Sequence, residues 1–295
     1  MIFRPNRLLG GFLGALLSAS SLVAQSSVWK VTRDSATLYL GGTCHVLRPG
    51  DFPLPPEFDE AYAGSTKLYF ETDVARMLSD ELLEVIAEQG MYSDGRTLAK
   101  VLSPAVWKAV QTYGAKSDLA PSQIRTMKPW LLVIMMAGVE MRKLGITDEG
   151  VDIHYFKKAL DGRKRVGELE SFEDHIAFLT RLGTGRENEM IEHTLEDLDE
   201  VPTRMISLLA AWRAGDVVRL DEVMLEDMRA KHPAIFQELL VSRNNAWLPT
   251  IEALVETPEV EFVLVGVGHM AGPEGLLALL RDRGYTVEQI TAVPP

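Results

Sequence analysis

Two stretches of the sequence share one layout, LYLGGTCH at residues 38–45 and FVLVGVGH at residues 262–269. In each, an apolar run typical of a buried β-strand leads into Gly-x-x-His. Each histidine, His45 and His269, is followed four positions later by a proline that has a glycine beside it. The shared layout predicts a pseudo-repeat, in which two strands from opposite ends of the chain end in similar turns.

Further strand candidates surround the first of these stretches. Residues 28–33 and 36–42 are β-prone runs separated by Asp34 and Ser35, which predicts a hairpin with a tight turn. A third candidate, at residues 67–72, is apolar and contains Glu71 near its end.

The C-terminal stretch is followed by a helix and another strand. A strand at residues 261–267, a helix at 273–283 with proline in its first turn and a strand at 286–290 predict a β-α-β unit. Strands at both ends of the chain, with helices between them, are expected to meet in one mixed sheet. The two ends of the folded chain should then be neighbours in space.

The middle of the chain has mostly helical periodicity, from residue 75 to residue 256. One short strand candidate, at residues 163–167, interrupts it. Residues 130–139 are apolar on every side but far shorter than a membrane span, which favours a buried helix. The expected fold class is α/β (α+β mixed), with a central mixed β-sheet and a large helical insertion that could cover the site.

The first 24 residues have the layout of a secretory signal peptide. Arg4 and Arg7 precede an almost uncharged apolar run at residues 8–23. Cleavage is expected near Ala24, although Leu22 is larger than the small residue preferred three positions before the cut. An uncleaved membrane anchor stays open as the alternative. We therefore expect an exported protein, periplasmic or secreted, with one domain over residues 25–295.

The chain is acidic and contains a single cysteine. Loss of Arg4 and Arg7 with the leader would change its formal charge from −12 to −14, with 28 basic and 42 acidic residues. We expect no nucleic-acid partner for such a surface. Because Cys44 has no second cysteine to pair with, stability must come from packing rather than from a disulfide within the chain.

Two imidazoles at strand ends can converge, because a sheet holds the backbone rigid and glycine allows close approach to a ligand. Neutral imidazole binds zinc and related divalent metals and also transfers protons near neutral pH. Glu71 would supply a carboxylate, either as a third ligand beside His45 and His269 or as a general base. The spacing alone leaves a plainer alternative, in which each histidine bonds to backbone in its turn.

Residues 38–56, LYLGGTCHVLRPGDFPLPP, resemble the opening signature of the TraB/GumN family. Further matching segments follow in order: YFETD at 69–73, GVDIH at 150–154, ELE at 168–170, RNNAW at 243–247 and GVGHMAG at 266–272. Each motif alone is unspecific, but their order and spacing are specific together and span nearly the whole chain after the leader. Cys44 departs from the aliphatic or small residue expected there and leaves the turn intact.

The family is similar to the Tiki metalloproteases, and more distantly to erythromycin-esterase-like and haem-binding ChaN-like proteins. By this resemblance His45, His269 and Glu71 are expected to form a metal-dependent peptidase site. Arg243 and Asn244 match the family's Arg-Asn pair. Arg243 could bind a carboxylate or an oxyanion, with Asn244 orienting it and contacting substrate. A surface ion pair is the alternative interpretation of Arg243.

Other candidate groups carry weaker signals. A thiol nucleophile at Cys44 is disfavoured, because adjacent side chains on an extended chain point to opposite faces. Glu189 and His193 have the i, i+4 spacing that a metal could use, but their acidic surroundings favour a solvated helix face.

Asp152 and Glu170 could form an outer shell around the site, although a structural role is favoured for the segment that contains Asp152 and His154. His175 and His232 have no partners that the sequence reveals.

The sequence therefore predicts a hydrolase, in particular a peptidase, that depends on zinc, manganese or cobalt, with iron also compatible. Its substrate would be a peptide or another small molecule, and it would contact a membrane only through an uncleaved leader. The rival hypothesis is a non-catalytic protein that captures a peptide, a signal molecule or a porphyrin. Glu71 favours catalysis, because a binding module has less need of a carboxylate beside two imidazoles.

Overall fold

The computed structural model describes residues 25–117, 119, 121–198 and 200–291. The predicted signal peptide, with its expected cleavage near Ala24, lies outside the described residues. Within these described ranges, we find no helix that combines the length and the apolar character needed to cross a bilayer.

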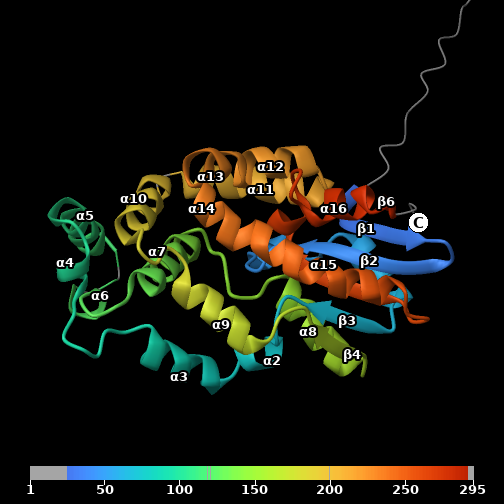
Figure 1. The fold of residues 1–295 in the computed structure, drawn as a ribbon, viewed down its shortest axis with the longest axis horizontal. Coiled ribbons are helices and arrows are strands. Elements are labelled where there is room, and N and C mark those ends of the chain that lie inside the picture. Colours follow the sequence, from blue (N-terminus) through green and yellow to red (C-terminus); the bar gives the residue numbers. More distant parts are fainter. Residues whose placement is uncertain (1–24, 118, 120, 199, 292–295) are drawn as a thin grey trace, which may run out of the picture.

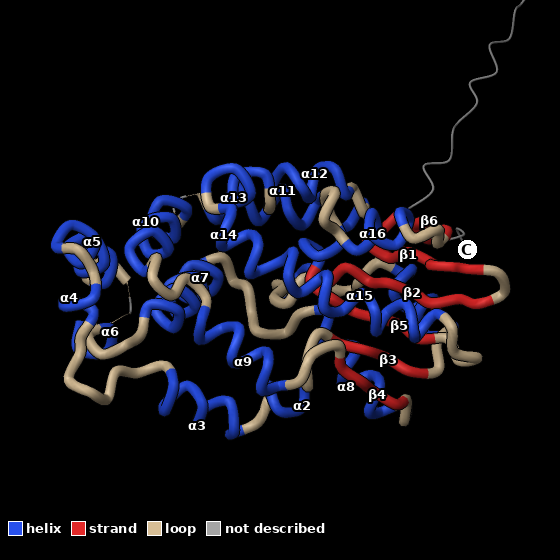
Figure 2. Tube along the Cα trace, in the orientation of Figure 1, coloured by secondary structure: helices blue, strands red, loops and turns tan. Residues whose placement is uncertain are grey.

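A mixed six-stranded sheet forms the centre of the fold, as predicted, with the strand order β4-β3-β5-β2-β1-β6 (Figure 2). The strands are β1 (Gln25–Arg33), β2 (Ala36–Thr43), β3 (Lys67–Phe70), β4 (Arg165–Glu168), β5 (Glu261–Gly266) and β6 (Thr286–Thr291). β1 is antiparallel to both of its neighbours, whereas β2, β5, β3 and β4 run parallel to one another. The carboxyl ends of these four strands therefore lie at one edge of the sheet.

The predicted N-terminal hairpin is present. β1 and β2 pair from Val28 opposite Gly41 to Arg33 opposite Ala36. Asp34 in the turn has a φ of 54°, a conformation that aspartate tolerates because its short polar side chain can bond locally. β1 also pairs with β6, so the two ends of the described chain are neighbours, as expected.

The C-terminal β-α-β unit is present with two differences from the prediction. β5 and β6 are not adjacent, because β2 and β1 lie between them. The helix α16 (Leu276–Asp282) begins three residues later than expected. The Asn244 side chain donates a hydrogen bond to the carbonyl group of Glu274, and the N–H of Gly275 bonds to the carbonyl of Gly272. With these bonds, residues 273–275, which were predicted to begin the helix, form a turn before it.

Two short strands are displaced from their predicted bounds. β3 ends at Phe70, so Glu71 follows the strand and is not part of it. β4 begins at Arg165, because Arg163 has a φ of 54°, which is outside the strand region. Beyond β4 the N–H of Glu170 still bonds to the carbonyl of Glu71, which keeps these two residues side by side.

Helices occupy most of the remaining chain (Figure 1). Before β4 come η1 (Pro49–Asp51), α1 (Pro56–Gly64), α2 (Val74–Met77), α3 (Asp80–Gln89), α4 (Leu98–Val101), α5 (Pro104–Gly114), α6 (Pro121–Ile124), α7 (Pro129–Lys143) and α8 (Val151–Asp161). Between β4 and β5 come α9 (Phe172–Arg181), α10 (Glu187–Asp197), α11 (Val201–Ala214), α12 (Val217–Met224), α13 (Glu226–Lys231), α14 (Pro233–Phe236), the π-helical turn η2 (Gln237–Val241) and α15 (Ser242–Val255). The short turn η3 (Val267–Met270) follows β5.

Helices cover both faces of the sheet. Along β5, Phe262 and Leu264 belong to one core, and Val263 and Val265 belong to the other. α1, α8 and α11 contribute to the first core, whereas α15 and α16 contribute to the second. Burial on both faces explains why the sequence of β5 is a nearly continuous apolar run and does not alternate.

The end of the molecule farthest from the sheet has a core of its own, built by α4 to α7 and α10 (Figure 1). α7 contains the helix predicted at residues 130–139. Leu132 and Met136 are fully buried there, but Ile134 is 44% exposed. The prediction of a buried helix is therefore confirmed for most of residues 130–139, and Ile134 marks the side of α7 that faces outwards.

Candidate active site

Three neighbouring parallel strands bring the predicted site residues together. In sheet order these strands are β3, β5 and β2, and beyond their carboxyl ends come Glu71, His269 and His45. The Nε2 atom of His45 lies 3.7 Å from Oε1 of Glu71, and Nε2 of His269 lies 3.9 Å from the same oxygen. Open α/β sheets bind ligands outside the carboxyl ends of their strands, which is where these three side chains meet.

Gly266 allows this close meeting. Its N–H donates to Oε1 of Glu71 at 2.6 Å. A Cβ atom here would lie 2.9 Å from Nε2 of His45 and 3.2 Å from Oε1 of Glu71, so a larger residue would displace the carboxylate or the imidazole. The two Gly-x-x-His turns nevertheless differ in conformation, because His269 lies in the 3-10 turn η3 whereas His45 lies in a bend. The prediction of similar turns is wrong in this respect.

Each histidine is held through its other ring nitrogen. Nδ1 of His45 lies 2.8 Å from Oδ2 of Asp152, in the first turn of α8, and the Thr43 hydroxyl donates to the second oxygen of Asp152. Nδ1 of His269 lies 2.6 Å from Oδ1 of Asn244. An amide oxygen can only accept, so the neutral ring of His269 carries its hydrogen on Nδ1 and presents the Nε2 lone pair to Nη1 of Arg243, at 3.3 Å. Partners of this kind orient metal-binding histidines.

Asn244 therefore lies behind the site. It is fully buried, and its amide group also donates to the carbonyl groups of His269 and Glu274. Direct contact with substrate, which the sequence predicted for Asn244, is incompatible with this burial. The residue positions His269 instead.

Arg243 is buried between two carboxylates. Its Nη2 atom donates to Oε2 of Glu71 at 2.7 Å and to Oε1 of Glu170 at 2.8 Å. Its Nη1 atom lies 3.3 Å from Nε2 of His269. The alternative of an ordinary surface ion pair is wrong, because the side chain of Arg243 is only 9% exposed.

Glu170 holds Arg243 and is itself held by two side chains for which the sequence predicted no role. Nδ1 of His175, on α9, lies 2.7 Å from Oε1 of Glu170, and the indole N–H of Trp247, on α15, donates to Oε2 at 3.1 Å. Trp247 follows Arg243 by four residues, a spacing that places both on one helix face and could have indicated this partnership. His175 offers no comparable signal in the sequence.

The charges of the site balance one another. Burial alone would raise the pKa of Glu71, but Arg243 and both histidines hold this pKa well below its usual range. Partial desolvation by the surrounding protein lowers the pKa of His45, but the carboxylates of Asp152 and Glu71 outweigh this effect and raise that pKa to about 9. For His269 burial dominates and lowers the pKa to about 4. An ionised Glu71 therefore lies between one imidazole that favours its charged form and one that stays neutral.

Solvent reaches the site at His45, whose side chain is 58% exposed, compared with 9% for Glu71 and 7% for His269. The neighbouring Cys44 is buried, and burial together with the charge of Asp152 raises the pKa of its thiol, which disfavours a thiolate nucleophile. His154 lies apart from these groups and packs against the rings of Phe52 and Tyr155.

The donor atoms match a divalent metal in type, but their spacing is slightly too wide. Imidazole nitrogen and carboxylate oxygen are ligands that zinc and related ions accept. Two ligands on one tetrahedral zinc lie about 3.3 Å apart, given bonds of about 2.0–2.1 Å. The distances here are 3.7 and 3.9 Å. In the described part of the chain, no three His, Cys, Asp or Glu side chains are placed to hold an ion without such an adjustment.

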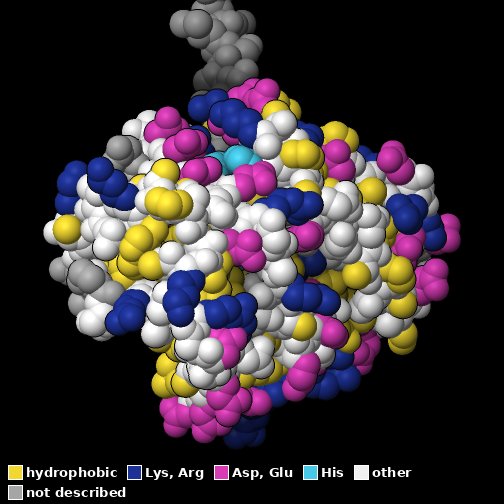
Figure 3. Space-filling model, turned by 60° about the vertical axis from the view of Figure 1, so that its left-hand side comes forward, with side chains coloured by type: hydrophobic (Ala, Val, Ile, Leu, Met, Phe, Trp, Pro, Cys, Tyr) yellow, Lys and Arg dark blue, Asp and Glu magenta, His cyan; other side chains and the backbone are white. Residues whose placement is uncertain are grey.

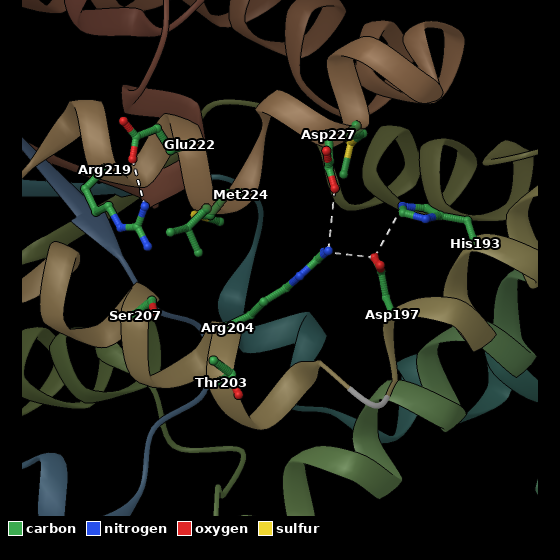
Figure 4. Close-up of a pocket in the computed structure, with 11 residues that line it drawn as sticks. His193, Asp197, Thr203, Arg204, Ser207, Arg219, Glu222, Met224 and Asp227 are labelled. Carbon is green, nitrogen blue, oxygen red and sulfur yellow. Dashed lines mark hydrogen bonds and ion pairs between the residues drawn. The ribbon is translucent and has the colours of Figure 1, made fainter.

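A polar cavity of about 250 Å³ lies away from these residues, among α10, α11, α12 and α13 (Figure 4). Arg204 reaches into it between Asp197 and Asp227, with N–O distances of 3.1 and 3.6 Å. The charged side chains around Arg204 therefore already have partners of opposite sign. Acidic and basic side chains are also interspersed over the face drawn in Figure 3.

The two residues with metal-like spacing, Glu189 and His193, contribute to this region without forming a common pair. Glu189 pairs with His232 at 2.8 Å, whereas His193 lies 3.4 Å from Asp197. The rings of His193 and His232 are in contact at a tilt of 31°, with their centroids 4.2 Å apart. The expected solvated helix face is wrong for His193, whose side chain is only 19% exposed.

Replacing His193 with Gln is expected to reduce the loss of stability on acidification. Burial lowers the pKa of His193 against the opposing charge of Asp197, and the charges of His232 and Arg204 lower this pKa further. The unfolded chain then binds the proton more tightly, so the wild-type free energy of unfolding falls as the pH drops below about 6.5. Urea denaturation at about pH 7.5 and 5.5 should give a smaller difference for His193→Gln. Lys231→Gln should behave like the wild type, and an unchanged difference in His193→Gln would contradict the assignment.

Comparison with known proteins shows the family to which the sequence belongs. The sequence matches the TraB/PrgY/gumN family over residues 27–289. It is 24% identical over 244 residues to the uncharacterized protein YbaP of Escherichia coli (strain K12), a match that covers 82% of this chain and 87% of YbaP.

Two similar proteins are named as metalloproteases. The identity is 23% over 321 residues to Metalloprotease TIKI2 of Xenopus tropicalis and 22% over 327 residues to Metalloprotease TIKI1 of Homo sapiens. These matches cover 90% and 92% of this chain, but 60% and 63% of the two metalloproteases. No solved structure matches the chain.

The family match includes β2, β3 and β5, and with them His45, Glu71 and His269, as well as Arg243 on α15. The match also includes α8, which carries Asp152, and α9 and α15, whose His175 and Trp247 bond to Glu170. The chain therefore belongs to the TraB/PrgY/gumN family.

Proposed function

We propose that this chain is an exported hydrolase that cleaves peptide bonds with a divalent metal ion held by His45, His269 and Glu71. The main support is the meeting of both Nε2 atoms at one oxygen of Glu71, at 3.7 and 3.9 Å. Each ring is oriented from behind, by Asp152 or by Asn244. The family membership and the distant metalloprotease relatives point to the same class of reaction.

Glu71 and Arg243 would have different roles beside a bound ion. A bound ion would supply Lewis acidity towards a water molecule and the substrate carbonyl. Glu71 is better suited to be a ligand than a general base, because Arg243 and the histidines keep its pKa low and its basicity weak. Arg243 would stabilise the negative charge that develops on the carbonyl oxygen, since it is fixed by Glu170 and retains its charge at any working pH.

The proposal is tested first by metal content. Tag-free protein purified without chelator is expected to carry roughly one ion per chain by mass spectrometry. His45→Ala, His269→Ala and Glu71→Gln should each lose the ion while circular dichroism shows a folded protein. His154→Gln is the matched control, because His154 packs against the rings of Phe52 and Tyr155 and is not one of the proposed ligands.

The outcomes separate the two candidate roles. Metal in the wild type and in His154→Gln, with none in the site variants, would justify a screen with peptide libraries. No metal after incubation with zinc, manganese and cobalt would contradict the metallohydrolase and favour a protein that captures its ligand without cleaving it. N-terminal sequencing of the protein from a periplasmic fraction tests export, with a new terminus expected just after Ala24.

A further inference from the structure

The turn that carries His269 packs against the junction of α12 with α13 and against η2. A Cβ atom added to Gly268 would lie 3.3 Å from the terminal methyl carbon of Met224 and 3.8 Å from side-chain carbons of Leu225 and Leu240. Met224 ends α12, Leu225 joins it to α13, and Leu240 lies in η2. These elements therefore limit how far η3 can move.

A group of charged side chains continues this contact along the segment that follows η3. Arg229, on α13, donates two hydrogen bonds to the carboxylate of Asp221, on α12, at 2.6 and 3.2 Å. Its Nη2 atom also lies 3.4 Å from Oε2 of Glu274, which comes shortly after η3. We call Arg229, Asp221 and Glu274 the Arg229 cluster. One arginine therefore joins α12 and α13 to the segment that leads from His269 to α16.

Gly272 lies against the Arg229 cluster from the other side. Its φ is 76°, a conformation that favours glycine. A Cβ atom here would lie 2.5 Å from Oδ1 of Asp221 and 2.7 Å from Nη2 of Arg229. The backbone between His269 and α16 therefore comes so close to the cluster that only a residue without a side chain fits.

Glu274 connects the Arg229 cluster to the imidazole of His269. Its backbone carbonyl group accepts a hydrogen bond from the side-chain amide group of Asn244 at 2.8 Å. The same amide group donates to the carbonyl group of His269 at 3.3 Å, and the amide oxygen lies 2.6 Å from Nδ1 of the ring. A short path of contacts therefore runs from Arg229 through Glu274 and Asn244 to His269.

We propose that Arg229 is a positioning residue, which fixes the orientation of the His269 ring through Glu274 and Asn244. The inference rests on the proposed function only where His269 is taken as a metal ligand. A ring held in one orientation binds an ion without first losing rotational freedom. Loss of a group that orients a ligating histidine weakens metal binding by about 10- to 100-fold. Arg229 acts through two other residues, so we expect about tenfold, the lower end of this range.

Arg229→Gln tests the positioning role in metal-free protein. In ¹H–¹⁵N spectra of tag-free protein at neutral pH, the Nδ1–H group of wild-type His269 is expected to give a sharp signal, because the ring is held and only 7% exposed. In Arg229→Gln this signal should broaden or disappear, since the ring would sample other orientations. Arg219→Gln is the control, because Arg219 pairs with Glu222 at the surface of the same helix, α12.

Zinc affinity provides a second measurement on the same variants. Arg229→Gln should raise the dissociation constant for zinc by about tenfold, and Arg219→Gln should leave it unchanged. Arg229→Lys keeps the positive charge but loses the paired donors of the guanidinium group, so an intermediate value is expected. This conservative variant keeps the test valid if circular dichroism shows that Arg229→Gln does not fold.

Gly272→Ala disturbs the Arg229 cluster without changing any charge. Its methyl group would displace Asp221 or Arg229, so the His269 signal and the zinc affinity should change as they do in Arg229→Gln. Gly284→Ala is the matched control. Gly284 has a φ of 83°, but a Cβ atom there would meet nothing within 4 Å. The two variants therefore share the backbone strain and differ in the collision.

An unchanged His269 signal in both Arg229→Gln and Gly272→Ala would overturn the inference. Equal losses in the controls Arg219→Gln and Gly284→Ala would overturn it as well, because the effect would then not depend on the Arg229 cluster. A wild-type chain that binds no zinc would contradict the metallohydrolase, whereas the His269 signal of the metal-free protein would still test the role of Arg229. The two proposals therefore fail in distinguishable ways.

Discussion

Replacing Arg243 with Ala is expected to lower the free energy of unfolding by about 3–5 kcal/mol. The guanidinium group donates to the buried carboxylates of Glu71 and Glu170, at 2.7 and 2.8 Å. Without it, both carboxylates stay in a poorly hydrated interior with too few opposite charges. Urea denaturation at neutral pH, followed by circular dichroism, measures the effect.

Two controls separate this charge effect from the loss of an arginine side chain as such. Arg181→Ala removes an exposed arginine at the end of α9 and should change stability by less than about 0.5 kcal/mol. The cost of Arg243→Ala should also shrink when Glu71 and Glu170 are both replaced by Gln, because no buried charge then lacks a partner. An equal cost in both backgrounds would mean that Arg243 stabilises the fold through packing alone.

Gly150→Ala is expected to destabilise the protein by at least about 3 kcal/mol, although it adds one methyl group. The new Cβ atom would lie 2.1 Å from the carbonyl carbon and oxygen of His45. These are backbone atoms, so α8 would have to move away from the His45 turn. This movement would break the hydrogen bond from the Val151 N–H to the Cys44 carbonyl and would separate Asp152 from His45.

Gly50→Ala is the matched control for this substitution. A Cβ atom at Gly50 would meet nothing within 4 Å, so a change within about 0.5 kcal/mol is expected. Guanidinium chloride denaturation of both variants gives the comparison. Similar stability of Gly150→Ala and Gly50→Ala would show that α8 can retreat from the His45 turn without cost.

Much of the sheet could be predicted from local patterns. The hairpin follows from two β-prone runs around Asp34 and Ser35, and the two Gly-x-x-His strands follow from their apolar residues. The convergence of His45, Glu71 and His269 could also be predicted, because parallel strands place their carboxyl ends at one edge. The strands needed only periodicity, whereas the choice of His45, Glu71 and His269 as one site also needed the resemblance to the TraB/GumN family.

The interactions around Arg243 could not be predicted in this way. Glu71 and Arg243 are 172 residues apart in the chain, and no local pattern encodes their contact. The π-helical turn η2 also lies directly before α15, which carries Arg243, and periodicity does not reveal such a turn. Likewise, α16 begins late because Asn244 bonds to the Glu274 carbonyl, a contact between distant segments.

The sheet order also determines when the protein can fold during its synthesis. β5 lies between β3 and β2, and the bond that joins Glu71 to Gly266 spans 195 residues. β6, which pairs with β1, is made later still. Apart from the first hairpin and the pairing of β3 with β4, the sheet cannot assemble until almost the entire polypeptide has left the ribosome. If the chain is exported, as we propose, the sheet would therefore remain incomplete for most of the time before export.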